Sequence, residues 1–159
     1  LALAATYNVS KPTIIANQQK SADEARMEVL PDGDSFTEYD GKLVNGVDDC
    51  YIADNKAGMA VTAEYKGFGG AVKVMIGIDA NGEITGVKVT EQSETPGLGT
   101  KAADPGYLKQ YQGVSEATAG HINDDPNIDA VTGATITSNA VYGSVVEALA
   151  QFKECGGVK

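Results

Sequence analysis

The sequence AVKVMIGIDANGEITGVKV, residues 71–89, has the pattern of a β-hairpin. Four apolar residues of its first half alternate with other residues, which gives a strand with one apolar face: Val72, Val74, Ile76 and Ile78. The following Asp79–Glu83 contains Asn-Gly, a strong short signal for a turn between antiparallel strands. The second strand then carries Ile84, Val87 and Val89.

The residues before this hairpin extend the antiparallel pattern. Cys50–Ala53 and Met59–Tyr65 read as strands, and the glycine-rich Lys66–Gly70 is the turn that leads into the hairpin. Further upstream, residues 13–29 predict a helix with Pro12 in its first turn, ended by Pro31–Asp34. Residues 35–49 are polar and fit either a strand or an irregular connection.

The residues after the hairpin predict smaller elements and one long helix. Pro105–Tyr111 fits a short helix, Gly113–Ala119 a strand, and Asn123–Asn127 a loop. From Asn139 to Phe152 apolar residues recur at spacings of four and three, which indicates an amphipathic helix that Cys155–Gly157 ends. The predicted fold class is therefore α+β: an antiparallel β-sheet meander packed by N- and C-terminal helices.

Composition restricts the classes of function. A chain of 159 residues fits one domain with a hydrophobic core. Its net charge of -10 argues against nucleic acid or anionic lipid bound through a basic face. The acidity either keeps the protein soluble or suits docking on a basic partner.

The cysteines and the histidine do not form a recognisable metal site. Cys50 and Cys155 are far apart, there is no CxxC pair, and His121 is the single histidine, so a metal or iron–sulfur site is not expected. A disulfide between the cysteines and two free thiols are both compatible with the sequence. Because no nucleophile pattern accompanies His121, we interpret it as a surface loop residue.

Two short segments carry the chemistry. DAVTGAT, residues 129–135, combines a carboxylate, hydroxyls and small residues just before the long helix. Small residues let a planar or phosphorylated group approach the backbone, and hydroxyls offer donors or an attachment point. ETPGLG, residues 94–99, follows directly on the hairpin, where a rigid scaffold can position a ligand loop. Taken singly, these segments are also a threonine-rich helix cap and a Pro-Gly turn.

Together, in this order, the segments resemble the FMN-binding domain family. Its attachment pattern is D-x-x-[ST]-G-A-T, whose last threonine carries FMN through a phosphoester bond, and ETPGLG is its second signature. Within the family the chain is similar to the G subunits of Rnf electron-transport complexes and, next, to the C subunits of sodium-pumping NADH:quinone reductases. The resemblance therefore implies covalent FMN on Thr135.

The resemblance also implies which other residues contact the cofactor. One group surrounds the attachment site: Asp129, Thr132, Gly133 and Ala134. The other group belongs to the second motif and the lysine after it: Glu94, Thr95, Pro96, Gly97, Leu98, Gly99 and Lys101. Thr137 or Ser138 is the predicted N-cap of the long helix, and the start of this helix would hold a phosphate without help from a lysine. Lys101 therefore has no required role there: it either approaches the flavin or is solvated. Tyr107 and Tyr111 either pack in the core beside the flavin or stack on it.

For function, the resemblance implies an electron carrier in a membrane ion-translocating ferredoxin:NAD oxidoreductase. Because the chain has no G-x-G-x-x-G nicotinamide motif, no catalysis is expected from it alone. Expected partners are other membrane subunits and a flavin transferase. Residues 1–11 would be the remainder of an N-terminal anchor, and residues 12–159 one extracytoplasmic domain. The alternatives are the quinone-reductase subunit, a flavin module of an extracytoplasmic reductase, and a cofactor-free structural or adhesive domain.

Overall fold

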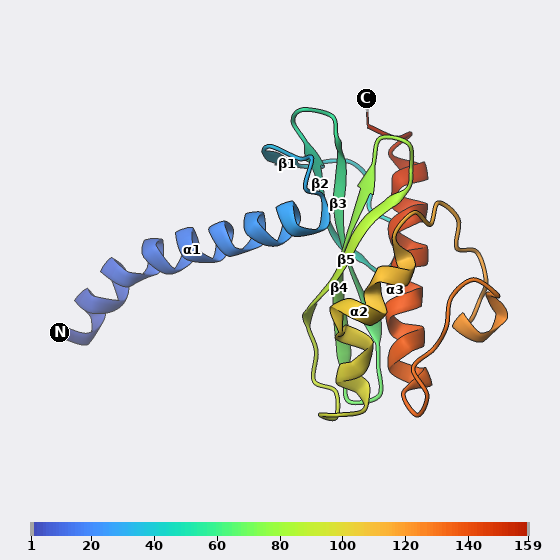
Figure 1. Cartoon of the computed structure of the whole chain (residues 1–159). Coiled ribbons are helices and arrows are strands. Elements are labelled where there is room, and N and C mark those ends of the chain that lie inside the picture. Colours follow the sequence, from blue (N-terminus) through green and yellow to red (C-terminus); the bar gives the residue numbers. More distant parts are fainter. Residues whose placement is uncertain (1, 159) are drawn as a thin grey trace.

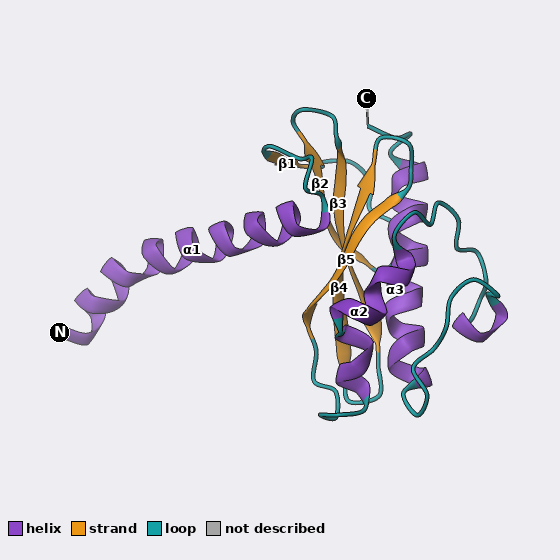
Figure 2. Cartoon of the chain, in the orientation of Figure 1, coloured by secondary structure: helices purple, strands orange, loops and turns teal. Residues whose placement is uncertain are grey.

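The centre of the protein is a five-stranded antiparallel sheet in the order β1-β2-β3-β4-β5. The computed structural model describes residues 2–158, and the side chains of the first helix from residue 16 onward. The strands are β1 (Phe36–Glu38), β2 (Val47–Ala53), β3 (Gly58–Lys66), β4 (Ala71–Asp79) and β5 (Ile84–Glu91). Each strand pairs with the next one along the chain, which confirms the predicted meander (Figure 2).

The β4–β5 hairpin forms as its sequence predicts. Ile76 pairs with Val87 and Ile78 with Ile84, so the apolar residues of the two strands share one face. In the turn, Gly82 has a φ of 87°, a conformation that glycine adopts without strain. The Asp79 carboxylate accepts hydrogen bonds from two turn amides and fixes the turn.

Helix α3 (Thr135–Glu154) covers one face of the sheet and packs against β3 and β4 (Figure 1). Its apolar face and the inward side chains of the strands form the main core, and Val141 and Val145 are fully buried there. The helix begins four residues before the predicted Asn139: Thr135, the last residue of DAVTGAT, and residues 136–138 form its first turn. It ends at Glu154 with Cys155 as its C-cap, and Gly156 and Gly157 after it adopt positive φ, as the glycines predicted.

Helix α1 (Ala2–Val29) reaches the opposite face of the sheet only with its C-terminal end (Figure 1). Val29 packs there with Ala60 and Met75. A side chain at Gly77 would overlap the Val29 carbonyl, so the helix approaches at a point where the sheet has no side chain. The rest of α1 projects away from the sheet.

The prediction that this helix starts at Pro12 is wrong, because helix α1 already begins at Ala2. Pro12 lies inside α1, where it removes one backbone donor and disfavours the helix locally, whereas the alanine- and leucine-rich residues before it favour helix. Within residues 2–158, no helix has both the length and the apolar composition needed to cross a membrane.

The segment between the sheet and α3 contains short helices and loops. The predicted helix over Pro105–Tyr111 is present as α2 (Pro105–Leu108) and the 3-10 turn η2 (Lys109–Tyr111). Two further 3-10 turns are η1 (Gly99–Ala103) and η3 (Ile122–Asp124). The predicted strand over Gly113–Ala119 is wrong: its first residues exchange two hydrogen bonds with Ile84, and the chain then leaves the sheet edge.

Both cysteines are free thiols in the structure. Cys50 lies in the main core, and burial raises the pKa of its thiol to about 12. Cys155 is half-buried at the end of α3. Of the two states that the sequence left open, the structure therefore has the reduced one.

Gln151 of α3 joins the helix to the loop between β1 and β2. Its side chain is fully buried. The Oε1 atom accepts a hydrogen bond of 2.6 Å from the Val44 N–H, and Nε2 donates one of 3.1 Å to the Lys42 carbonyl. A third bond of 3.1 Å runs to Cys155 Sγ. The polar loop over residues 40–46 is thus held by one helical side chain.

We expect Gln151→Ala to lower the free energy of unfolding by about 2–4 kcal/mol, because buried backbone groups of the loop lose their partners. Urea denaturation followed by circular dichroism measures this loss. Gln112→Ala is the matched control: that glutamine is exposed, so its replacement changes stability by less than about 0.5 kcal/mol. Equal effects of the two substitutions would contradict the role of Gln151.

Candidate functional site

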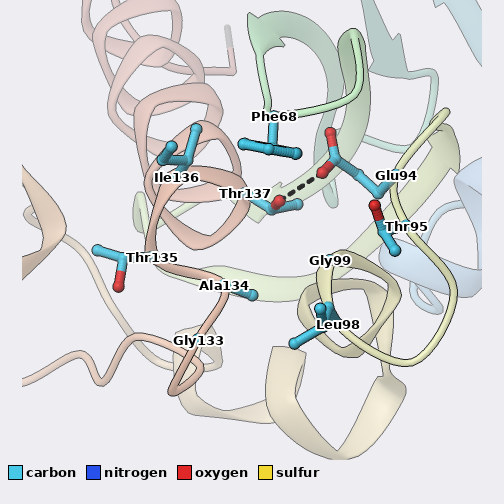
Figure 3. A pocket seen from close by; sticks show the side chains of 10 residues that line it. All are labelled: Phe68, Glu94, Thr95, Leu98, Gly99, Gly133, Ala134, Thr135, Ile136 and Thr137. Atoms are coloured by element: carbon cyan, nitrogen blue, oxygen red, sulfur yellow. Dashed lines mark hydrogen bonds between the residues drawn. The ribbon is translucent and has the colours of Figure 1, made fainter.

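A cavity of about 370 Å³ lies where the start of α3 meets the loop after β5 and the turn between β3 and β4 (Figure 3). These three segments are far apart in the sequence and contribute all of its lining residues: Phe68, Glu94, Thr95, Leu98, Gly99, Gly133, Ala134, Thr135, Ile136 and Thr137. The two motifs singled out in the sequence therefore face each other across one cavity.

Helix α3 begins at Thr135, so the attachment threonine is its first residue. Ala134 is the N-cap and provides no side-chain hydrogen bond, which makes the predicted N-caps Thr137 and Ser138 wrong. Both hydroxyls have other partners: Ser138 Oγ accepts from the Val131 N–H at 2.9 Å, and Thr137 donates to Glu94. The Ser138 bond folds the chain back onto the helix, and Gly133, with a φ of 80°, completes the turn.

The first turn of α3 presents backbone donors at the cavity. Ser138 N–H already bonds to the Ala134 carbonyl. Across the described residues, the amides of Thr135, Ile136 and Thr137 have no such acceptor. Unpaired amides and the positive end of the helix dipole favour an anion at this position.

The Glu94 carboxylate connects all three segments of the site. It is buried, with 7% of its surface exposed. Its Oε2 accepts a hydrogen bond of 2.6 Å from Thr137 Oγ1, and its Oε1 accepts one of 3.0 Å from the Gly69 N–H. Both oxygens are thus engaged within the protein, and each keeps a further lone pair with which a ligand in the cavity could bond.

Glycines make room for this carboxylate. A Cβ atom added at Gly99 would lie 2.6 Å from Glu94 Oε2. One added at Gly67 would overlap Glu94 Oε1. The glycines of ETPGLG and of the β3–β4 turn therefore allow the segments to close around Glu94, in addition to shaping the loops.

The rim of the cavity carries apolar side chains that are exposed to an unusual degree. Phe68 is 72% exposed, Ile136 55% and Leu98 49%. Phe68 and Ile136 lie on one side of the cavity and Leu98 on the other (Figure 3). Sequence reasoning identified Leu98 but missed Phe68 and Ile136. The available signal was an aromatic residue surrounded by glycines in the Lys66–Gly70 turn.

The structure separates the sequence-predicted residues into two sets. Those that line the cavity are Glu94, Thr95, Leu98, Gly99, Gly133, Ala134 and Thr135. Those outside its lining are Pro96, Gly97, Lys101, Asp129 and Thr132. Their own contacts explain some of these positions: the Asp129 backbone bonds twice to the Gln110 side chain, and the Gly97 N–H bonds to Thr100 Oγ1.

Tyr107, Tyr111 and His121 lie outside the cavity lining as well. The two tyrosine rings form an edge-to-face pair with centroids 6.4 Å apart, and Tyr111 is fully buried. Burial raises the pKa of the Tyr111 phenol far above its ordinary value. Core packing therefore accounts for both tyrosines. His121 Nδ1 accepts a hydrogen bond from the Asn123 N–H and caps η3.

The site as a whole suits a ligand with an apolar planar part and an anionic part. The rim offers apolar contact, the helix start offers donors, and Thr135, the first residue of the helix, offers a hydroxyl. In the part of the chain that the structure describes, no three His, Cys, Asp or Glu side chains gather as a metal site would require.

Comparison with known proteins agrees with this geometry. A family model described as "FMN-binding domain" matches residues 67–150, more than half of the chain and the part that contains both motifs. The chain belongs to the FMN-binding domain family.

Its relatives within this family are G subunits of ion-translocating complexes. The G subunit of the proton-translocating ferredoxin:NAD(+) oxidoreductase complex of Clostridium ljungdahlii is 32% identical, over 99% of this chain and 85% of that protein. The G subunit of the Na(+)-translocating ferredoxin:NAD(+) oxidoreductase complex of Acetobacterium woodii is 34% identical, over 91% and 80%. The chain is a homologue of these proteins.

A solved structure shows the same fold. The C subunit of the Na(+)-translocating NADH-quinone reductase of Parabacteroides distasonis superposes with a TM-score of 0.53 at 21% identity, covering 68% of this chain and 60% of that one. The five-stranded sheet with helices from both ends of the chain is therefore the fold of that protein too.

We expect Thr137→Val to lower the free energy of unfolding by about 1.5–3 kcal/mol, because a buried carboxylate loses a short hydrogen bond while the side-chain shape is kept. Denaturant unfolding of the protein without cofactor measures it. Thr132→Val is the control, since Thr132 is exposed and its replacement leaves stability within about 0.5 kcal/mol. A neutral Thr137→Val would mean that the Glu94–Thr137 bond does not hold the segments together.

Proposed function

We propose that this chain is the G subunit of an Rnf-type ion-translocating ferredoxin:NAD oxidoreductase and carries electrons on FMN bound to Thr135 through a phosphoester. The observation that carries the proposal is the position of Thr135. Its hydroxyl belongs to the first residue of α3, at the edge of a cavity with an apolar rim. The proposed complex follows from the homology of this chain to G subunits.

The residues at the site fit both ends of FMN. The amides of Thr135, Ile136 and Thr137 would face the phosphate, and a phosphodiester retains one negative charge that they and the helix dipole stabilise. Leu98, Phe68 and Ile136 would contact the isoalloxazine, whose ring system suits a mostly apolar pocket of this size. Bound FMN supplies the electron transfer, and the protein supplies placement and electrostatics.

The proposed partners follow from the proposed complex. They are its other membrane subunits, which exchange electrons with this chain, and a flavin transferase that attaches FMN during maturation. We also propose that residues 1–11 belong to a membrane-anchor segment and that residues 12–159 form one extracytoplasmic domain. The part of helix α1 that follows residue 11 would then separate the flavin site from that anchor (Figure 1). The isolated chain relays electrons and turns over no substrate.

We expect Thr135→Ala to abolish covalent FMN, because the attachment oxygen is lost, and to leave the fold intact, because the hydroxyl is not part of the core. After coexpression with a flavin transferase, the denatured wild type should gain the mass of FMN less one water, localised to Thr135 by peptide mapping. Thr132→Ala is the control and should keep the full modification. Denatured Thr135→Ala protein that still carried FMN would place the attachment elsewhere.

We expect Leu98→Asp to leave FMN attached but to shift the visible absorption bands and the reduction potential of the flavin, because a charge replaces an apolar contact. The control is Met27→Asp, on α1, a residue of similar exposure outside the cavity lining. Spectra and potentials of the two variants are compared with those of the wild type. An unchanged spectrum and potential for Leu98→Asp would remove Leu98 from the flavin contacts.

A further inference from the structure

The lining of the cavity contains one ionisable side chain, that of Glu94, among the residues described. The other lining residues are apolar, glycine or threonine. Lysines occur on neighbouring segments, at Lys66 and Lys101, but neither of them lines the cavity. A ligand in this cavity therefore faces a fixed carboxylate without a cationic side chain in the lining.

We propose that Glu94 sets a low reduction potential for the flavin by placing a buried negative charge, with no cationic side chain beside it in the lining, in the wall of its cavity. This inference rests on the proposed function, since it requires FMN at this site. It assigns Glu94 a role beyond joining the motifs: the residue acts on the flavin electrostatically, through space.

Burial gives this charge its effect. Only 7% of Glu94 is exposed, so water screens it poorly, and its two hydrogen bonds hold it in one place. Each electron that a partner delivers without a proton adds one negative charge to the cavity. A fixed carboxylate opposes that addition and so favours the oxidised form. The lining hydroxyls are too weakly acidic to supply the missing proton.

The backbone donors at the start of α3 affect the two ends of the ligand differently. The free amides of α3 lie beside Thr135, where they would offset the phosphate charge. The Glu94 carboxylate bonds to Thr137 in the first turn of α3, so the helix dipole offsets part of its charge, but no cationic side chain of the lining does so. Glu94 is held on the other side of the cavity from Thr135 in Figure 3, so the ring would be left with the carboxylate as its nearest formal charge from a side chain.

The test compares full-length FMN-loaded proteins, with loading verified by intact mass. The midpoint potential is measured by reduction against a reference dye. Glu94→Gln removes the charge and keeps the size, so its potential should shift to more positive values, with about tenfold more reduced flavin at a fixed potential. Thr137→Val is the matched control: it breaks a hydrogen bond of the same carboxylate but keeps the charge, so its potential should stay below that of Glu94→Gln.

A second pair keeps the proposal testable if Glu94→Gln does not fold. Thr95→Lys adds a cation at an exposed lining position beside Glu94 and should raise the potential, whereas Thr95→Gln should not. Equal potentials in wild type, Glu94→Gln and Thr95→Lys overturn the role of Glu94. If Glu94→Gln does not fold, equal potentials in Thr95→Lys and Thr95→Gln overturn it. A wild type that fails to load FMN at Thr135 instead contradicts the proposed function.

Discussion

The Glu94 carboxylate is the interaction on which the site depends, because it is the point where three distant segments meet. One oxygen holds the β3–β4 turn through the Gly69 N–H, and the other holds the first turn of α3 through Thr137. Neither contact is local in sequence, and the carboxylate that makes them is buried. Breaking a hydrogen bond to a buried charge costs more than breaking one between neutral groups. One side chain therefore joins the ETPGLG loop to the β3–β4 turn and to the first turn of α3.

The topology of the sheet brings these three segments close together. The β3–β4 turn and the end of β5 lie at the same end of the meander, since neighbouring strands run antiparallel. Helix α3 packs lengthwise on β3 and β4, which brings its first residue to that end. Glycines at positions 67 and 99 then let the backbones approach the carboxylate closely. Packing of the core thus places the segments, and the hydrogen bonds of Glu94 set their final alignment.

The sequence predicted the sheet well because its strands are local in pairing: alternation over residues 72–78 and an Asn-Gly turn determine the register without distant information. The prediction failed where contacts between residues far apart in the sequence determine the structure. Gly113 and Val114 make only two backbone hydrogen bonds, both to Ile84, so this segment forms no strand. Thr137 looked like a helix cap because capping residues and residues that bond to a distant carboxylate have the same hydroxyl. Phe68 was missed because the sequence shows only an aromatic residue in a glycine-rich turn; its position at the rim of the cavity depends on the folded structure.

The proposed covalent bond and the charge of the cavity explain each other. Cationic side chains placed to hold a phosphate in a small site would also stabilise the reduced ring. A phosphoester on Thr135 retains the cofactor without them, and free helix amides are sufficient for its single remaining charge. The carboxylate of Glu94 can then act on the ring without a cation in the lining to neutralise it. On this argument, a lysine introduced into the lining would weaken the low potential while leaving attachment through Thr135 unaffected.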